Sequence, residues 1–264
     1  MSNKENVVSQ FGKNAGKYVK SKGHAKGQDL TVLLEIVKEN KNGHLLDIAT
    51  GGGHVANTLA PLFEKVVALD LTPKMLEKAK EFIEGNGHTN VSFVQGDAES
   101  LPFHDKTFDT VSCRIAPHHF SHVERFAGEV YRVLKENGLF LLVDNVAPEI
   151  DEYDQFYNDV EKKRDPSHYR AYKKTEWISL LEQKGFRIES FSVFKKKFLF
   201  EVWCEMMALP EKDKTELNEY MISSSQDMIK FFSIDIKDNQ VQSFQGEAML
   251  LVARKERGGK LKPA

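Results

Sequence analysis

Short apolar runs alternate with amphipathic segments through the first half of the chain. The runs are HLLDIA (44–49), VVALDL (66–71), VSFVQGD (91–97), FDTVSCRI (108–115) and LFLLVDN (139–145), each typical of a buried strand. Between them, the segments 54–63, 73–87 and 123–135 have a helical pattern. This alternation indicates βαβ units with right-handed crossovers. We therefore predict an α/β fold: a doubly wound, Rossmann-like, mostly parallel sheet with helices on both faces.

The remaining segments surround this core. Residues 1–27 are polar and indicate a loosely helical leader, and residues 28–39 repeat apolar side chains at helical spacing. The chain after Pro148 is charged and rich in tyrosine, and the stretch 187–203 has the pattern of an extended segment. We predict one domain made of a helical leader or lid (1–39), a cofactor-binding core (40–147), a helical lid insertion (148–175), the C-terminal part of the sheet (176–255) and a frayed tail (256–264).

The charge balance narrows the class of partner. Of the 264 residues, 37 are Lys or Arg and 39 are Asp or Glu, a net charge of −2, so we expect no nucleic-acid partner. No apolar run approaches the ~20 residues of a membrane span, and the polar start predicts no signal peptide. Cys113 and Cys204 match no disulfide or metal spacing, which favours the cytoplasm. The run Lys195 to Lys197 is typical of a solvated strand edge.

A glycine-rich turn follows the first predicted strand, in LLDIATGGGHVA (45–56). Such a turn, opening a helix, lets a ligand approach bare backbone and the helix N-terminus. Gly51 and Gly53, with Ala56, fit the dinucleotide pattern G-x-G-x-x-A. Asp70 ends the second strand 19 positions after Gly51, where a carboxylate can bind ribose hydroxyls. On this pattern alone, NAD and other nucleoside cofactors fit equally well.

Two further acids favour one of these cofactors. Asp47 lies on the first strand just before the turn, and it would repel a pyrophosphate but attract a cation. Asp97 ends the third strand, where it can accept a hydrogen bond from an adenine amino group, while the backbone of Ala98 donates to the ring. S-adenosylmethionine carries an ammonium and a sulfonium and no phosphate. The acids therefore favour S-adenosylmethionine.

Several ordered blocks resemble the class I S-adenosylmethionine-dependent methyltransferases, closest to the branch of ubiquinone/menaquinone-type C-methyltransferases and many small-molecule enzymes. The blocks are LLDIATGGG, VVALDLTPKML, VSFVQGDAESLPFHDKTFDTVSCRIAPHHF and EVYRVLKENGLFLLVD, within residues 40–145. The resemblance implies a seven-stranded sheet whose last strand, AMLLVARK (248–255), is antiparallel.

The same resemblance assigns cofactor contacts by position. It implies that Asp47 and the glycines Gly51 to Gly53 hold the methionine part, and it counts Ala49 among the cofactor-binding residues. Ala49 stands where the family most often has glycine, which puts the turn geometry in question. The other implied contacts are Asp70 with the ribose, Leu71 and Met75 with the adenine or ribose face, Asp97 and Ala98 with the adenine edge, Arg114 beneath the methionyl group, and Tyr18 in a lid.

Histidines after the fourth predicted strand offer acid–base chemistry. His118 and His122 are four apart, a spacing that can bind metal on a helix, but no nearby acid or cysteine completes a ligand set, so we predict no metal. His118, His119 and His168 are candidates for a general base near neutral pH. A base is needed only if the methyl acceptor must lose a proton, and the sequence does not choose among the three.

These patterns predict methyl transfer from S-adenosylmethionine to a small-molecule acceptor by in-line displacement. Two alternatives stay open: an NAD-dependent oxidoreductase on the same sheet, and a non-catalytic S-adenosylmethionine-binding protein. A homodimer is compatible with the sequence. The identity of the acceptor and the atom that receives the methyl group are not determined by these residues.

Overall fold

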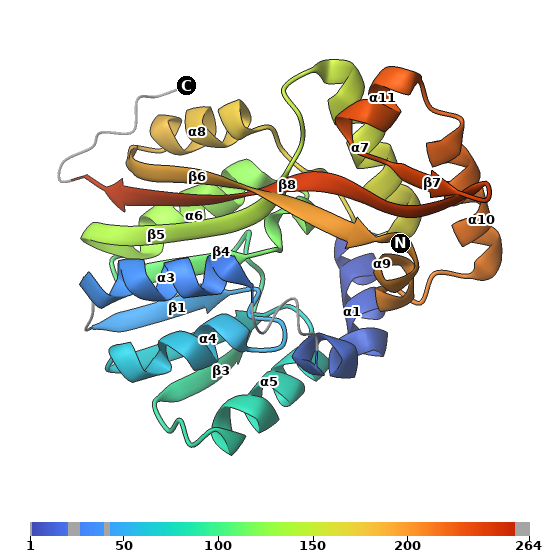
Figure 1. Ribbon diagram of the computed structural model, residues 1–264. Coiled ribbons are helices and arrows are strands. Elements are labelled where there is room, and N and C mark those ends of the chain that lie inside the picture. Colours follow the sequence, from blue (N-terminus) through green and yellow to red (C-terminus); the bar gives the residue numbers. More distant parts are fainter. Residues whose placement is uncertain (1, 21–26, 40–42, 257–264) are drawn as a thin grey trace.

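The computed structural model describes residues 2–20, 27–39 and 43–256, apart from the side chains of residues 17–20 and 28. Eight strands form one sheet in the order β3-β2-β1-β4-β5-β8-β6, with β7 pairing β8 (Figure 1). The strands are β1 (His44–Ile48), β2 (Lys65–Asp70), β3 (Val91–Gln95), β4 (Phe108–Arg114), β5 (Leu134–Val146), β6 (Phe186–Leu199), β7 (Asp235–Lys237) and β8 (Gln240–Lys255). The first five strands pair in parallel, and β8 runs antiparallel to both β5 and β6.

The predicted fold class is confirmed, with an antiparallel last strand. The sheet has one strand more than expected, because the chain before β8 turns back through the short β7. The order of the strands reverses at β1, which pairs with β2 on one side and β4 on the other. Ligands of open α/β sheets bind at such a switch point, beyond the carboxyl ends of the strands.

Alternating side chains of the strands divide the core into two layers. Leu45 and neighbouring strand residues pack against α3 (Gln28–Glu39), α4 (His54–Leu59) and α5 (Pro73–Gly85). Leu46 points to the opposite face, where α6 (Val123–Val133) and α8 (Lys174–Gln183) supply Phe126 and Trp177. This two-residue period is why the short apolar runs could be recognised as strands buried on both faces.

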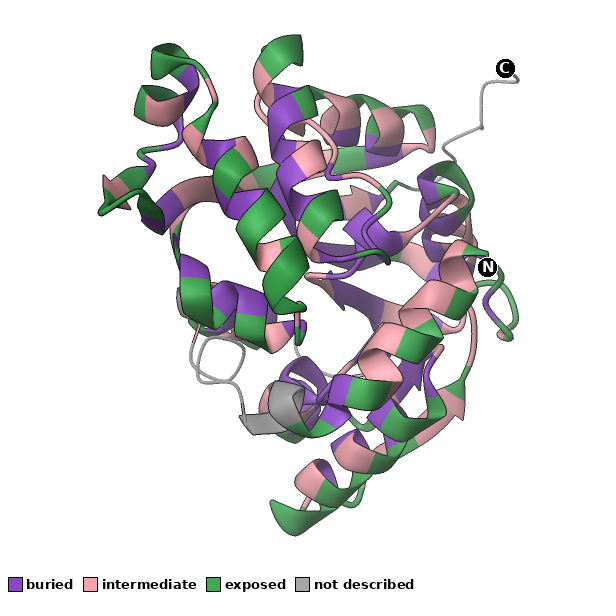
Figure 2. Ribbon diagram, turned by 90° about the vertical axis from the view of Figure 1, so that its right-hand side faces the viewer, coloured by how far each residue is buried: buried purple, intermediate pink, exposed green. Residues whose placement is uncertain are grey.

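A third apolar cluster lies beyond the sheet, at the side where the parallel strands end (Figure 1). It is built from α7 (Asp151–Arg164), α9 (Phe200–Met206), α10 (Glu211–Ile222) and α11 (Gln226–Phe231). We call these helices the cap. The prediction of an extended segment over 187–203 is wrong in its last four residues, because Phe200, Trp203 and Cys204 are buried in the cap at helical spacing. Figure 2 shows the exposed residues on the outward faces of the helices and the buried ones behind them.

The leader forms a single helix, α1 (Asn3–Lys20), which packs on α5. Thr72 occupies the N-cap position of α5, as expected for the residue before Pro73, but its hydroxyl makes no capping hydrogen bond. Of the lysine run, Lys195 and Lys197 are exposed, whereas Nζ of Lys196 lies inside and donates to Oδ1 of Asn145 at 3.1 Å.

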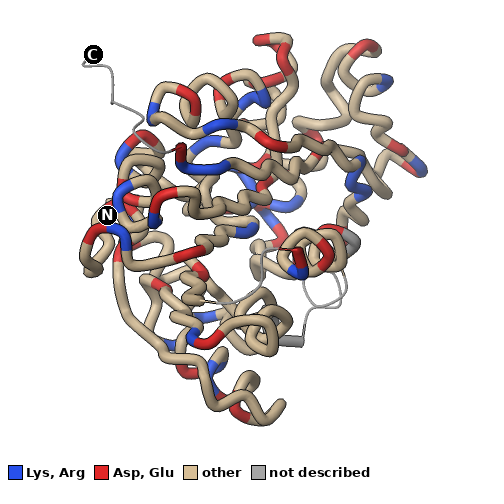
Figure 3. Tube along the Cα trace, turned by 90° about the vertical axis from the view of Figure 1, so that its left-hand side faces the viewer, with Lys and Arg blue, Asp and Glu red and all other residues tan. Residues whose placement is uncertain are grey.

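Positive and negative residues are interspersed along the chain on the side opposite the cap (Figure 3). Within the residues that the structure describes, no helix is both long enough and apolar enough to cross a bilayer.

Candidate active site

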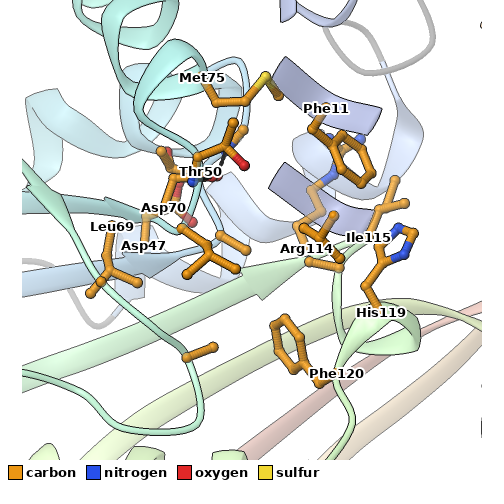
Figure 4. Close-up of a pocket in the computed structure, with 18 of the residues that line it drawn as sticks. Phe11, Asp47, Thr50, Leu69, Asp70, Met75, Arg114, Ile115, His119 and Phe120 are labelled. Atoms are coloured by element: carbon orange, nitrogen blue, oxygen red, sulfur yellow. Dashed lines mark hydrogen bonds between the residues drawn. The ribbon is translucent and has the colours of Figure 1, made fainter. Parts of the chain in front are cut away.

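A cavity opens at the switch point of the sheet, where the ends of β1, β2, β3 and β4 meet α1 (Figure 4). Acidic residues and the glycine turn form one side, and Phe11, Ile115, His119 and Phe120 lie on the other side. The lining residues are Lys4, Val7, Phe11, Asp47, Ala49, Thr50, Gly51, Gly52, His54, Val55, Leu69, Asp70, Leu71, Thr72, Met75, Gly96, Asp97, Ala98, Glu99, Arg114, Ile115, Ala116, His119 and Phe120.

The structure brings most of the predicted site residues to this cavity. Those that line it are Asp47, Ala49, Gly51, Asp70, Leu71, Met75, Asp97, Ala98 and Arg114. Gly53 is not among the lining residues, since it sits at the N-cap of α4 against α5. Tyr18 belongs to α1, but its side chain falls outside the described part of the structure.

The glycine turn depends on left-handed backbone. Ala49, Gly51 and Gly53 have φ angles of 52°, 55° and 82°. A Cβ at Gly53 would lie 3.3 Å from Cα of Ala79 and 2.9 Å from Cδ1 of Ile83, so this glycine allows α4 to pack closely on α5. Ala49 adopts the left-handed conformation that glycine favours, so the turn has this geometry although it has no glycine at position 49.

Asp47 is buried at the end of β1, with only 1% of its surface exposed. Its two oxygens accept hydrogen bonds from Oγ1 of Thr50 at 2.6 Å and from Oγ of Ser112 at 2.8 Å. Burial raises the pKa of Asp47 to about 6, although these hydrogen bonds favour the ionised form. The carboxylate is therefore a buried negative charge at neutral pH.

Asp70 stands at the end of β2 and is also buried. Its Oδ2 accepts from the backbone N–H of Gly51 at 2.9 Å, and its Oδ1 accepts from the backbone N–H of Thr72 at 2.8 Å. Burial raises the pKa of Asp70, and the two backbone donors oppose that rise. Each oxygen keeps a second lone pair that can accept from a ligand hydroxyl.

The helix α1 closes the cavity over the end of β3. Nζ of Lys4 lies 2.6 Å from Oδ2 of Asp97 and 2.7 Å from Oε2 of Glu99, so one lysine forms ion pairs with two carboxylates. Burial opposes the charge of Lys4, but these carboxylates raise its pKa. Val7 and Phe11 continue the same face of α1 into the cavity. Nothing in the sequence near Lys4 indicated these contacts.

Arg114 ends β4 and is held by α3. Its Nε donates to Oδ2 of Asp29 at 2.5 Å and its Nη2 to Oδ1 at 3.1 Å. Burial disfavours the charge of Asp29, but Arg114 holds the pKa of that carboxyl below its usual value. The guanidinium beside the cavity is thus already paired with a carboxylate.

The three candidate histidines lie together, yet their positions differ. His118 is buried behind the cavity, with Nδ1 2.6 Å from Oδ1 of Asp144. Burial acts against protonation, but Asp144 raises the pKa of His118. His168 is buried farther away and bonds Asn158 through Nε2 at 2.9 Å, whereas His119 lines the cavity. Among the described residues, no group of three or more His, Cys, Asp or Glu side chains could hold a metal ion.

Comparisons with known proteins agree on one family. A model described as a methyltransferase domain matches residues 46–142. The uncharacterized methyltransferase YcgJ of Bacillus subtilis is 35% identical over 242 residues, which cover 91% of this chain and 96% of that protein. The crystal structure of YcgJ matches with a TM-score of 0.84 and 33% identity, covering 87% of this chain and 99% of that chain.

Two more relatives are informative. A Bacillus halodurans protein assigned to the methyltransferases has a crystal structure that is 50% identical, with a TM-score of 0.86, and covers 88% of this chain and 100% of that chain. The demethylmenaquinone methyltransferase of Thermotoga maritima is 34% identical over 119 residues, which cover 44% of this chain and 49% of that enzyme.

Proposed function

Because this chain belongs to the class I S-adenosylmethionine-dependent methyltransferases, we propose that the cavity at its switch point binds S-adenosylmethionine and presents the methyl group to a small-molecule acceptor. The membership confirms the resemblance found in the sequence, and the relatives do not favour an NAD-dependent oxidoreductase. The observation that carries the proposal is the row of three carboxylates, Asp47, Asp70 and Asp97, at successive strand ends of one cavity.

The charges in the cavity fit a ligand with a cationic end and no phosphate. Asp47 is a buried carboxylate beside the glycine turn. The nearby cations Lys4 and Arg114 are engaged by Asp97 and Asp29, so they are poorly placed to neutralise a pyrophosphate. The desolvated negative charge at Asp47 would strengthen attraction to an ammonium or sulfonium group.

We assign the parts of the ligand to the lining residues. Asp47, Ala49 and Gly51 would hold the methionine part, with Arg114 beneath it. Asp70 would accept from the ribose hydroxyls through its remaining lone pairs, with Leu71 and Met75 against the same part. Asp97 and Ala98 would hold the adenine edge. The close packing of Gly53 supports an indirect role, in fixing the turn.

The bound cofactor would supply an electrophilic methyl group on a good leaving group. The protein's contribution is then alignment and exclusion of water. The β-strand ends fix the carboxylates, and Val7 and Phe11 of α1 cover the cavity with apolar surface. The acceptor would enter on the side of Phe11, Ile115 and Phe120.

We also propose that the enzyme works in a reducing compartment such as the cytoplasm, since Cys113 and Cys204 are both free and buried. The demethylmenaquinone methyltransferase of Thermotoga maritima supports a small organic acceptor, although the match spans about half of that enzyme.

The test is calorimetric titration with S-adenosylhomocysteine. Asp70→Ala should raise the Kd by about 10- to 150-fold, because two hydroxyls lose a charged partner worth ~1.5–3 kcal/mol. Asp109→Ala is the matched control, since Asp109 is paired with Lys135 and does not line the cavity. An unchanged Kd in Asp70→Ala would reject the ribose assignment, and wild-type protein that fails to bind would reject the proposed function.

A further inference from the structure

His119 lines the cavity on the side opposite Asp47 and Asp70 (Figure 4). The backbone around it is fixed: its N–H donates to the carbonyl of Ala116 at 2.9 Å, and its carbonyl accepts from Nδ2 of Asn3 at 2.7 Å. The ring meets Phe11 edge-on, with centroids 5.0 Å apart. Contacts from α1 and from the segment after β4 therefore hold the imidazole in place.

The hydrogen bonds of Ser167 determine the tautomer of this ring. Nδ1 of His119 lies 3.1 Å from the carbonyl oxygen of Ser167, which can only accept. It also lies 3.3 Å from Oγ of Ser167, whose single proton is donated to Oδ1 of Asp165 at 2.6 Å. Nδ1 thus faces two acceptors and must carry the proton. In a neutral ring, Nε2 then has a lone pair, and no described residue donates to it.

Its surroundings favour the neutral form of the His119 ring at neutral pH. Burial and the neighbouring His118 lower the pKa of His119 to about 3, which outweighs the opposite effect of Asp165. Arg164 also disfavours protonation. Asp144 contacts His118 and raises its pKa, so of the two neighbouring rings His118 takes up a proton more readily than His119. With Nδ1 protonated, Nε2 is therefore a hydrogen-bond acceptor at neutral pH.

Several apolar side chains line the same side of the cavity as His119 (Figure 4). Val7, Phe11, Ile115 and Phe120 line the cavity together with His119. One acceptor nitrogen in an apolar wall selects a molecule with an apolar body and a single hydrogen-bond donor, because a buried polar group left unpaired is costly. An ionised oxygen would meet the lone pair of Nε2 and be repelled.

We propose that Nε2 of His119 binds the methyl acceptor by accepting a hydrogen bond from a neutral hydroxyl group on an otherwise apolar, phenol-like molecule. This inference rests on the proposed function and adds the substrate class and the residue that recognises it. It also chooses one of the three histidines that the sequence left open.

The same arrangement also provides a place for the hydroxyl proton of the acceptor. As the acceptor oxygen bonds to the methyl carbon, the electron pair of the broken carbon–sulfur bond stays on sulfur, and the hydroxyl proton passes to Nε2. A weakly basic imidazole suffices, since an oxygen with a third bond is strongly acidic. The imidazolium then returns the proton to water. A methylated amine would keep its proton instead, so an oxygen acceptor suits this ring better.

The test compares two probes on protein saturated with S-adenosylhomocysteine: 2-naphthol and 2-methoxynaphthalene, which keeps the apolar body without the donor. Ligand-observed NMR gives both Kd values. Wild-type protein should bind 2-naphthol at least about tenfold more tightly. His119→Asn keeps an N–H near Ser167 but has no acceptor at the position of Nε2, so the ratio should fall to about one. His122→Asn makes the same change at an exposed residue outside the cavity and should keep the wild-type ratio.

The outcomes separate the two proposals. S-adenosylhomocysteine should bind His119→Asn within about threefold of wild type. Wild-type protein that binds this compound but shows no preference for 2-naphthol, or binds neither probe, overturns the role of His119 alone. A preference that survives in His119→Asn does the same. Long-range ¹H–¹⁵N spectra give an independent readout, and a proton on Nε2 of His119 in the free protein also overturns the inference. Protein that does not bind S-adenosylhomocysteine overturns both proposals.

Discussion

The buried carboxylate of Asp47 should make the free enzyme less stable than a variant without that charge. In the folded protein the pKa of Asp47 is about 6, compared with 3.8 for the ordinary side chain. The ionised form is therefore disfavoured by folding. Below about pH 4 the carboxyl group is protonated in both the folded and the unfolded protein, and it does not lower the free energy of unfolding. As the pH rises towards 6 the unfolded state ionises first, and the free energy of unfolding falls until the folded carboxyl group ionises too.

The magnitude follows from the two pKa values. At 1.36 kcal/mol for each pH unit, a rise from 3.8 to about 6 corresponds to ~3 kcal/mol at pH 7.5 and about half of that at pH 5. Asp47→Asn removes the titration. The hydroxyls of Thr50 and Ser112 can each donate or accept, so they can also form two hydrogen bonds with the amide of the variant.

The assay is urea unfolding of the free protein at pH 5.0 and pH 7.5. We expect Asp47→Asn to be more stable than wild type at both pH values, and its advantage in free energy of unfolding should be ~1 kcal/mol larger at pH 7.5 than at pH 5.0. The same variant should bind S-adenosylhomocysteine more weakly. A variant that is less stable at pH 7.5, or a difference that does not change with pH, would refute the reasoning.

Two further predictions concern packing and charge beside the cavity. Gly53→Ala should destabilise the protein by ~2–4 kcal/mol, because the new Cβ would press on the backbone of Ala79 and φ at this position is 82°. In Gly51→Ala the new Cβ would meet no atom closer than 3.5 Å, so this variant should lose only ~1 kcal/mol in urea unfolding. Equal losses would contradict the packing argument. Asp29→Asn should destabilise the protein by ~2–4 kcal/mol in urea unfolding, because it removes a carboxylate from the buried guanidinium of Arg114. A loss below about 0.5 kcal/mol, as for an ion pair on the surface, would contradict this prediction.

The parts of the fold that depend on local pattern could be predicted from the sequence. The helix expected over 28–39 is α3, Gln28–Glu39, and the strand expected over 44–49 is β1, His44–Ile48. The meeting of Asp47, Asp70 and Asp97 at one cavity has a related reason. In a parallel sheet the carboxyl ends share one edge, so the spacing along the chain already fixes which side chains meet.

Contacts between distant segments could not be predicted. Lys4 pairs with Asp97, 93 positions away, and no local pattern says where an amphipathic helix such as α1 will pack. The proposed role of His119 rests on its contact with Ser167, which lies 48 positions later in the chain. The helix α9 was missed because Phe200 and Trp203 are buried by the cap, and a run of aromatic residues fits a strand equally well when the cap is unknown.

The position of β8 in the sheet affects how the chain folds during its synthesis. This strand pairs with β5 on one side and β6 on the other, although it is synthesised after both. While the ribosome is still translating the cap, β5 and β6 each present an open row of amide and carbonyl groups that can capture another nascent chain. A message broken before the codon for Gln240 would leave those edges open permanently, so its product is expected to aggregate or be degraded rather than retain partial activity.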